Sequence, residues 1–196
     1  MRVIAGTAKG VPLKVPRQGT RPTTDRVREA VFSVLAGWAG TAGEPAETQL
    51  AGLSVLDLYA GSGAVAIEAA SRGAGPVLAV DAAPAAVVAI TANAAATGLD
   101  VQPVKADALA YLNSAPSVAT GFDIVWLDPP YDVPDRALSA VLARLCDGWL
   151  SADSLVAVER SQRGPQVSWP AQLAHRWSRR YGETVVSFAE TGGDAT

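Results

Sequence analysis

Cysteine, histidine and methionine are almost absent, since the 196 residues include only one of each. A lone cysteine cannot form an internal disulfide, and no group of cysteine and histidine has the spacing of a metal site, so we expect no bound metal. Apolar residues make up 49% of the chain, yet no run of them approaches the roughly 18 residues of a membrane span. Residues 1–6 lack the apolar stretch of a signal peptide. These absences predict a soluble, cytoplasmic protein that does not enter a membrane.

The net charge of −3 is distributed unevenly along the chain. Residues 1–28 carry seven basic side chains against one acidic side chain, a balance of +6. Residues 160–196 have a balance of +2, so the stretch between these two segments stands at −11. A basic N-terminal arm on an acidic body suits a partner that carries phosphates, although solvated surface is an equally good interpretation of these clusters.

The length of the chain suits one domain with a single sizeable core. We expect a basic hairpin extension at 1–20, one catalytic domain at 21–190 and a disordered tail at 191–196. Within the domain, the apolar spacing alternates between strand and helix periods. Strands are predicted at 54–59, 77–81, 101–105, 122–127, 154–159, 177–181 and 184–188, and helices at 25–40, 64–72, 84–97, from 108 onward and at 134–146. This order predicts a Rossmann-like α/β fold, with a mostly parallel, seven-stranded sheet covered by helices on both faces.

Ligands of such folds bind at the carboxyl ends of the strands, and the first strand leads into a glycine-rich loop. Gly61, Ser62 and Gly63 allow a tight turn and a close approach of a ligand to the following helix. The loop alone also fits a dinucleotide site, or a turn without a ligand. Asp57 decides against a dinucleotide, because its carboxylate would repel a pyrophosphate but can bind the cationic amino-acid group of S-adenosylmethionine.

The next two strands also end in acidic residues. Asp81 follows the glycines by about twenty residues, where an acid commonly binds ribose hydroxyls. Asp107 is equally compatible with capping a helix and with recognising adenine. Acids at three successive strand ends outline a bound nucleoside.

The fourth strand ends in the tetrapeptide Asp128-Pro129-Pro130-Tyr131. Two prolines cannot continue a strand ladder, so they fix the backbone at its end. Their carbonyl oxygens and the Asp128 carboxylate can accept hydrogen bonds from an amino group, while the ring of Tyr131 offers a stacking face for a base. Such acceptors would activate an aromatic amine, whose lone pair is otherwise delocalised, for direct methyl transfer. The alternative is an Asp-Pro-Pro turn without a function.

These motifs together resemble a known family. The loop at 57–63 and the tetrapeptide at 128–131 are similar to those of nucleic-acid amino-methyltransferases. The block Arg21-Pro22-Thr23-Thr24-Asp25-Arg26-Val27-Arg28-Glu29, the N-terminal residues 2–6 and Gly148-Trp149-Leu150 resemble the RsmD family, which methylates N2 of guanine 966 in 16S ribosomal RNA. The similarity runs from residue 2 to about 190. The departures are small: Tyr59 and Tyr131 stand where phenylalanine is also seen, and the loop at 41–52 is longer than usual.

The resemblance implies a class I S-adenosylmethionine-dependent methyltransferase domain that acts on 16S ribosomal RNA, within an assembling or assembled small subunit. The implied cofactor-binding residues are Asp57, Tyr59, Gly61, Ser62, Gly63, Asp81, Asp107 and Ala108. The implied catalytic residues are Asp128, Pro129, Pro130 and Tyr131. The candidate RNA-binding residues are Arg2, Lys9, Lys14, Arg21, Thr23, Thr24, Arg26 and Arg28. The block at 21–28 is expected to cover the cofactor or to contact the RNA.

Other functions remain as alternatives. An amino-methyltransferase of another RNA or DNA base would use the same motifs. A nicotinamide-dependent oxidoreductase would leave residues 128–131 unexplained, and a non-catalytic RNA-binding assembly factor would have no need for Asp57 and Asp128. A carbon-5 cytosine methyltransferase needs a cysteine nucleophile, whereas Cys146 lies in an apolar helical pattern. We expect His175 at the surface or in a structural role, and Trp38, Trp126 and Trp149 in the core.

Overall fold

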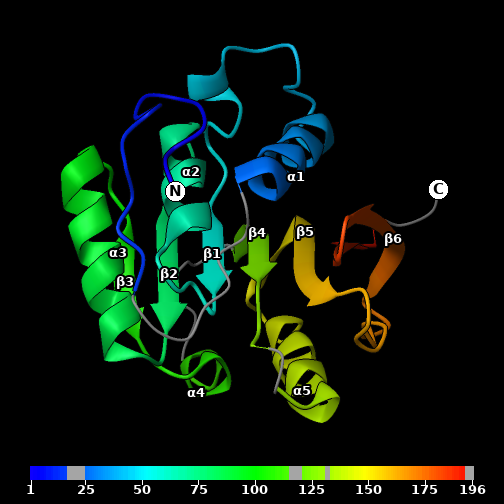
Figure 1. Ribbon diagram of the computed structural model, residues 1–196. Coiled ribbons are helices and arrows are strands. Elements are labelled where there is room, and N and C mark those ends of the chain that lie inside the picture. Colours follow the sequence, from blue (N-terminus) through cyan, green and yellow to red (C-terminus); the bar gives the residue numbers. More distant parts are fainter. Residues whose placement is uncertain (17–24, 115–120, 131–132, 193–196) are drawn as a thin grey trace.

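The computed structural model describes residues 1–16, 25–114, 121–130 and 133–192. Its centre is a seven-stranded sheet in the order β3-β2-β1-β4-β5-β7-β6 (Figure 1). The strands are β1 Val55–Leu58, β2 Val77–Asp81, β3 Gln102–Lys105, β4 Phe122–Leu127, β5 Leu150–Ser161, β6 Leu173–Tyr181 and β7 Thr184–Thr191. Strands β1 to β5 pair in parallel, and β7 pairs antiparallel with both β5 and β6. The predicted fold is therefore confirmed: the sheet is mostly parallel, with an antiparallel end.

Helices cover both faces of this sheet. The helices are α1 Asp25–Trp38, α2 Ala64–Ser71, α3 Pro84–Thr97, α4 Ala108–Leu112 and α5 Asp135–Leu145, with a 3-10 turn, η1, at Ala46–Thr48. The first face packs against α1, α2 and α3, whereas the second packs against α4 and α5. Trp126 is buried on the first face and Trp149 on the second, as predicted, while Trp38 is half-buried at the margin of the first. None of the described helices has the length and apolar character of a membrane span.

Several local expectations need correction. Strand β5 has 12 residues, twice the predicted length, because only its central part is buried and therefore patterned. His175 lies inside β6 and not before it, but it is exposed and bonds Glu190 at 2.8 Å, which confirms its surface position. The N-terminal hairpin contains a single bridge, Arg2 to Pro12, in place of two continuous strands. Cys146 is half-buried at the end of α5, where its Sγ donates to the carbonyl of Leu142.

The N-terminal arm, residues 1–14, packs as part of the domain. Its apolar residues Val3, Ala8 and Leu13 are buried in the first-face core. Its backbone is bound by α2, because the Glu68 carboxylate accepts from the amides of Ile4 at 2.7 Å and Ala5 at 3.0 Å. Packing against the core and the bonds to Glu68 therefore hold the arm in place, together with the hydrogen bonds of its own turn.

Glu68 also binds two arginines in the same buried site. Its side chain is fully buried, with Arg72 Nε at 3.0 Å and Arg28 Nε at 3.7 Å from its carboxylate oxygens. Arg28 is buried as well, and it donates to the carbonyl of Arg2. Burial lowers the pKa of Arg28, and the neighbouring Glu68 and Asp25 carboxylates oppose that shift. The arm, α1 and α2 therefore meet at one buried carboxylate.

Replacing this carboxylate should destabilise the whole domain. Glu68→Ala leaves two buried guanidinium groups without their acid, which typically costs about 3–5 kcal/mol of unfolding free energy. Glu29→Ala, on the exposed side of α1, is the control and should change the unfolding free energy by less than about 0.5 kcal/mol. Urea unfolding of both variants measures the difference. Equal stabilities would contradict the central role of Glu68.

Candidate active site

The strand register brings the predicted acids to one edge of the sheet. Leu58 of β1 pairs with Val80 of β2 on one side and with Leu127 of β4 on the other. The residues that follow these partners, Tyr59, Asp81 and Asp128, therefore stand side by side at the carboxyl edge. The amide of Asp128 extends this ladder by donating to the Leu58 carbonyl at 3.4 Å. The glycine loop and the Asp-Pro-Pro segment are thus neighbours in space.

The loop between β1 and α2 turns through three left-handed residues. Tyr59, Gly61 and Gly63 have φ values of 62°, 55° and 72°. For Tyr59 this conformation costs about 1–2 kcal/mol, which the surrounding structure must offset. At Gly63 the space is also tight, since a Cβ atom would lie 3.0 Å from Cγ1 of Ile90 and would require that side chain to shift. The strain and the close packing hold the loop tightly against the first turn of α2.

Asp57 is buried beneath this loop. Its Oδ2 accepts from the amide of Ala66 in the first turn of α2, at 3.1 Å. Burial raises the pKa of the Asp57 carboxyl to about 8, with a smaller contribution from the charge of Asp81, and the Ala66 hydrogen bond opposes the shift. A cation brought to this edge would favour the ionised form. Asp57 therefore positions the loop, and its contact with a cofactor stays a prediction.

Asp81 and Asp107 each bind backbone amides at their strand ends. Asp81 accepts from Gly61 with Oδ2 and from Ala83 with Oδ1, both at 2.8 Å. Asp107 caps α4 by accepting from Ala110 at 3.0 Å, which confirms the capping interpretation. A carboxylate offers about four lone-pair positions, so these bonds leave acceptor capacity at both residues. Adenine recognition by Asp107 stays a prediction.

Tyr59 directly follows β1. Its side chain is half-buried against the second-face core, which also contains Ala108. Burial, followed by the charge of Asp107, raises the pKa of Tyr59 to about 12. The phenol is therefore neutral at physiological pH, and it faces the carboxylate that caps α4. Tyr59, Asp107 and Ala108 form one wall of the site.

The Asp-Pro-Pro segment forms the other wall. Asp128 is half-buried, Pro129 is buried and Pro130 is exposed. The carbonyl of Pro130 already accepts from the amide of Val133 at 3.0 Å, so it is committed to the turn that leads into α5. The Asp128 carboxylate and the Pro129 carbonyl are therefore the better candidates for binding an amino group. Tyr131 lies outside the described residues.

A buried asparagine links the N-terminal arm to the glycine loop, and sequence reasoning missed it. Asn93 of α3 donates to the carbonyls of Ser62 at 2.8 Å and Lys14 at 2.9 Å, and accepts from the amide of Lys14 at 2.8 Å. Met1 reaches the same loop, where its sulfur accepts from Ser62 Oγ at 3.7 Å. The available signal was the single amide side chain on the apolar, alanine-rich helix 84–97, whose other polar residues are two threonines.

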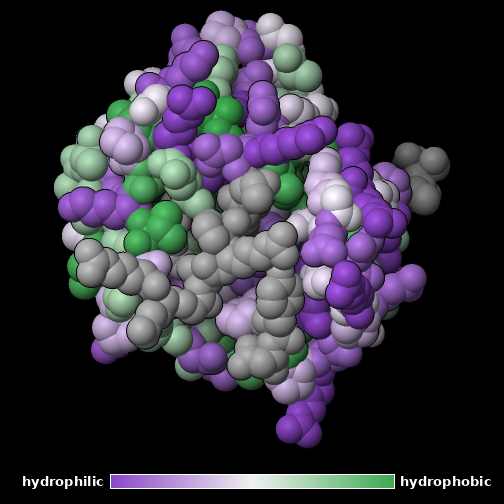
Figure 2. Space-filling view, in the orientation of Figure 1, coloured by the Kyte–Doolittle hydropathy of each residue, from purple (hydrophilic) through white to green (hydrophobic). Residues whose placement is uncertain are grey.

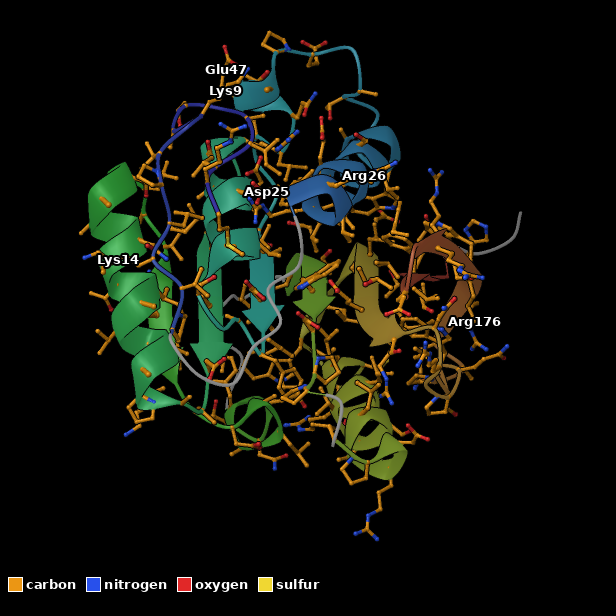
Figure 3. All side chains as sticks on the ribbon, in the orientation of Figure 1. Lys9, Lys14, Asp25, Arg26, Glu47 and Arg176 are labelled. Atoms are coloured by element: carbon orange, nitrogen blue, oxygen red, sulfur yellow. The ribbon has the colours of Figure 1, made fainter. Side chains whose placement is uncertain are left out.

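The candidate RNA-binding residues are distributed over separate parts of the surface. Lys9 lies near Glu47, at the end of the molecule away from the glycine loop (Figure 3). The arm turns there, at the C-terminal end of α2, where the amide of Thr7 donates to the carbonyl of Ser71. Lys14 is exposed beside α3 (Figure 3). These two lysines therefore cannot share one short contact.

The remaining candidates differ in exposure. Arg2 and Arg26 are exposed, whereas Arg28 is buried in the Glu68 cluster and is not available to a nucleic acid. Arg21, Thr23 and Thr24 lie outside the described residues. Within the described ranges, no group of three or more metal-ligating side chains is present.

The raised pKa of Asp57 predicts a specific pH dependence of stability. Its pKa is about 8 in the folded protein against an ordinary value of 3.8. Between these values the unfolded chain binds fewer protons, so ionisation disfavours folding and this contribution lowers stability as pH rises to about 8. Asp57→Asn keeps an oxygen for Ala66 but cannot ionise. Relative to the parent, it should gain stability progressively from pH 5 to 8 and level off above.

Urea unfolding at each pH measures this difference, with the exposed Asp153→Asn as the control for a generic loss of charge. Parent and Asp57→Asn curves that run parallel across the whole pH range would show that Asp57 is not protonated in the folded state.

Comparisons with known proteins agree with the fold. The chain matches the family model described as Conserved hypothetical protein 95 over residues 1–190. The YlbH protein of Bacillus subtilis is 33% identical over 98% of this chain and 100% of its own length. The Ribosomal RNA small subunit methyltransferase D of Escherichia coli is 32% identical over 90% of this chain and 83% of its own.

A solved structure gives the same result. The yhhF protein of Escherichia coli superposes with a TM-score of 0.79 at 28% identity, over 97% of each chain. The family match spans nearly all of the described residues, including the glycine loop and the Asp-Pro-Pro segment. The chain therefore belongs to the Conserved hypothetical protein 95 family, the family of the RsmD methyltransferases.

Proposed function

We propose that this protein transfers a methyl group from S-adenosylmethionine to N2 of a guanine in ribosomal RNA, and that the target is guanine 966 of the 16S RNA in the small subunit. One observation carries the proposal: Asp128 stands beside Tyr59 and the glycine loop at the same sheet edge. The edge thus brings the acids proposed for the cofactor next to acceptors for an amino group. The membership of the chain in the RsmD family supports ribosomal RNA as the substrate.

The residues at this edge fit S-adenosylmethionine. Asp81 supplies a carboxylate beside the glycine loop, which suits the ribose diol, and Asp57 lies beneath the loop, where the ammonium group would favour its ionised form. Tyr59 and Ala108 supply an apolar wall beside Asp107, which suits an adenine ring. When bound, this cofactor supplies an activated methyl group on a sulfonium sulfur.

Asp128 and Pro129 would orient the acceptor. The exocyclic amine of guanine is a weak nucleophile because its lone pair is delocalised into the ring. Hydrogen bonds from its two protons to the Asp128 carboxylate and the Pro129 carbonyl would localise that lone pair on nitrogen and direct it at the methyl carbon. The amine nitrogen would take the methyl group from the sulfonium sulfur and lose one proton, for which the Asp128 carboxylate is the candidate acceptor.

The target base must leave its stack to reach these acceptors. Extrusion costs a few kcal/mol for a paired base and less for a base in a loop. Tyr131 follows the acceptors directly in the chain and is proposed as the stacking face. Asp57 separates this proposal from a dinucleotide site, since it places a carboxylate below the loop where a pyrophosphate would lie.

Removing the proposed amine acceptor should abolish transfer without loss of cofactor binding. Asp128→Ala should lower the single-turnover rate by at least about 100-fold, because positioned acceptors typically contribute 10²–10⁴-fold. Calorimetry should show nearly unchanged affinity for S-adenosylmethionine. Asp153→Ala, an exposed acid near the start of β5, is the control and should retain the parent rate.

The product of the parent enzyme tests the target at the same time. Labelled methyl groups should appear as N2-methylguanosine in nucleoside mass spectrometry of treated ribosomal RNA, and fragment mapping should place them at guanine 966. A different methylated base, or a different guanine, would refute that part of the proposal. A near-parent rate for Asp128→Ala would refute the acceptor role.

Asp81 should matter for the cofactor and much less for RNA. Asp81→Ala removes acceptors proposed for the ribose and also releases the Gly61 amide, so affinity for S-adenosylmethionine should fall roughly 10- to 100-fold, as for a lost charged hydrogen bond. RNA binding without cofactor should change little. Asp100→Ala, exposed before β3, should bind cofactor as the parent does. If Asp81→Ala bound S-adenosylmethionine with the affinity of the parent, Asp81 would not be the residue that binds the ribose.

A further inference from the structure

A concave surface lies at the antiparallel end of the sheet. It is a groove of about 640 Å³ between strands β5, β7 and β6 and the loop that follows β5. This volume lies within the range of about 300–1,000 Å³ that is usual for ligand sites. None of the residues proposed above for the cofactor or the target base lines it. The groove therefore has no role in the proposed reaction so far.

The cations of this groove gather on one face through the strand register. Arg160 of β5 pairs with Val185 of β7, and Val185 pairs with Arg180 of β6, so the three side chains form one row. Arg176 lies four residues before Arg180, and because side chains alternate along a strand it shares that face. This is the face on which Trp169 packs against the second core.

The three arginines are not equally engaged. Arg160 bonds Asp135 at 3.1 Å, and Arg176 braces the loop by donating to the carbonyl of Pro170 at 2.8 Å. Arg180 is exposed and donates with Nε to the Gly182 carbonyl at 3.0 Å, and no salt bridge to it is found within the described ranges. The described residues that line the groove include no acid, although Arg160 is paired with Asp135 outside the lining. The charges of Arg176 and Arg180 are therefore available to an anionic ligand.

An aromatic side chain accompanies these cations. Trp169 lines the groove and is half-buried against the second-face core, so its ring is held in place while part of it stays accessible. Aromatic side chains beside arginines form the usual surface for single-stranded nucleic acid, because bases stack on the rings while phosphates meet the cations. Figure 2 shows hydrophilic residues gathered over the side of the molecule where β6 lies.

The groove reaches the same edge of the sheet as the candidate active site. Val158 of β5 pairs with Leu127 of β4, so Arg160 stands at the same carboxyl edge as Asp128, one strand away. The Arg160 to Asp135 ion pair also connects the groove to the start of α5, the helix that follows the Asp-Pro-Pro segment in the chain. Arg180 is three strands from Asp128, about 14 Å at the usual strand spacing of about 4.8 Å. A strand of RNA can span that distance. Figure 3 shows Arg176 on this side, next to β6.

We propose that this groove binds the single-stranded RNA next to the target nucleotide, with Arg180 and Arg160 on its phosphates and Trp169 under a base. The inference rests on the proposed function, since it takes the substrate to be RNA. It assigns the substrate contact to the C-terminal hairpin in addition to the N-terminal arm. We infer this ligand from its chemistry. The phosphates of an RNA strand suit the arginines of the groove, and its bases suit the ring of Trp169.

The test compares two arginines that are neighbours on β6. Arg180→Ala removes a groove cation, and Arg179→Ala removes an equally exposed cation whose side chain points to the opposite face. The probe is an RNA oligonucleotide with the sequence around guanine 966, titrated over a range of salt concentrations. Arg180→Ala should weaken binding roughly 5- to 20-fold and reduce the salt slope by about 0.7, the value for one phosphate on single-stranded nucleic acid. Arg179→Ala should match the parent.

Trp169→Leu tests the stacking contact while keeping an apolar side chain in the core. Loss of one stacked base should weaken RNA binding roughly 5- to 100-fold with an unchanged salt slope. Both groove variants should bind S-adenosylmethionine as the parent does, which excludes a folding defect. The KM for RNA should rise more than kcat falls, because neither side chain touches the reacting atoms.

The outcomes separate the two proposals. If the parent binds and methylates the RNA but Arg180→Ala matches it, or if Arg179→Ala loses as much affinity, the groove proposal is wrong and the proposed function stands. If the parent neither binds nor methylates RNA, both are wrong. If Arg180→Ala loses affinity for polyglutamate and not for RNA, the groove binds an acidic protein segment.

Discussion

The buried carboxylate of Glu68 is the interaction on which the N-terminal half of this protein depends. A buried charge is costly unless it is paired and hydrogen-bonded, and Glu68 satisfies this condition with partners from three segments. Two are backbone amides of the arm, and two are the guanidinium groups of Arg28 and Arg72. Arg72 in turn lies 5.0 Å from the ring centre of Phe32, so the cluster continues into α1. A basic arm thereby becomes part of the core.

Acids also bind backbone amides at the candidate active site. Asp57 fixes the first turn of α2, and Asp81 holds the glycine loop through Gly61. Each acid shapes the site before any ligand arrives, and each keeps acceptor capacity that a cationic or hydroxyl-bearing ligand can use. Asn93 adds a further tie between the loop and the arm. Preorganisation of this kind reduces the ordering that binding would otherwise require.

The basic residues of this protein have two different roles, and their position in the chain does not predict which role each one has. Arg28 and Arg72 serve the core, whereas Lys9, Lys14 and Arg26 remain at the surface. At the other end of the sheet, one arginine from β5 and two from β6 share one groove. A negative net charge is therefore compatible with an RNA substrate, because attraction depends on local clusters and not on the total.

Local patterns in the sequence were sufficient for most of the fold. The strands β2 and β4 and the helix α3 have the predicted bounds, because their apolar periods and flanking turn residues are local properties. The order of acids and glycines along the chain likewise placed Asp57, Asp81, Asp107 and Asp128 at strand ends. The family followed from motifs that are contiguous in the chain, such as the block at 21–29.

Contacts between distant segments were decided only by the tertiary structure. Three features depend on which elements become neighbours: the burial of Arg28, the four partners of Glu68 and the link through Asn93. The local spacing of apolar residues does not specify these neighbours. The groove depends on the strand order β5-β7-β6, which sets Arg160 and Arg180 in one row although twenty residues separate them. Sequence alone therefore determined the type and order of the elements and the acids at their ends. The fold decided which charges are buried and which remain available, because desolvation and pairing arise only when the chain has packed.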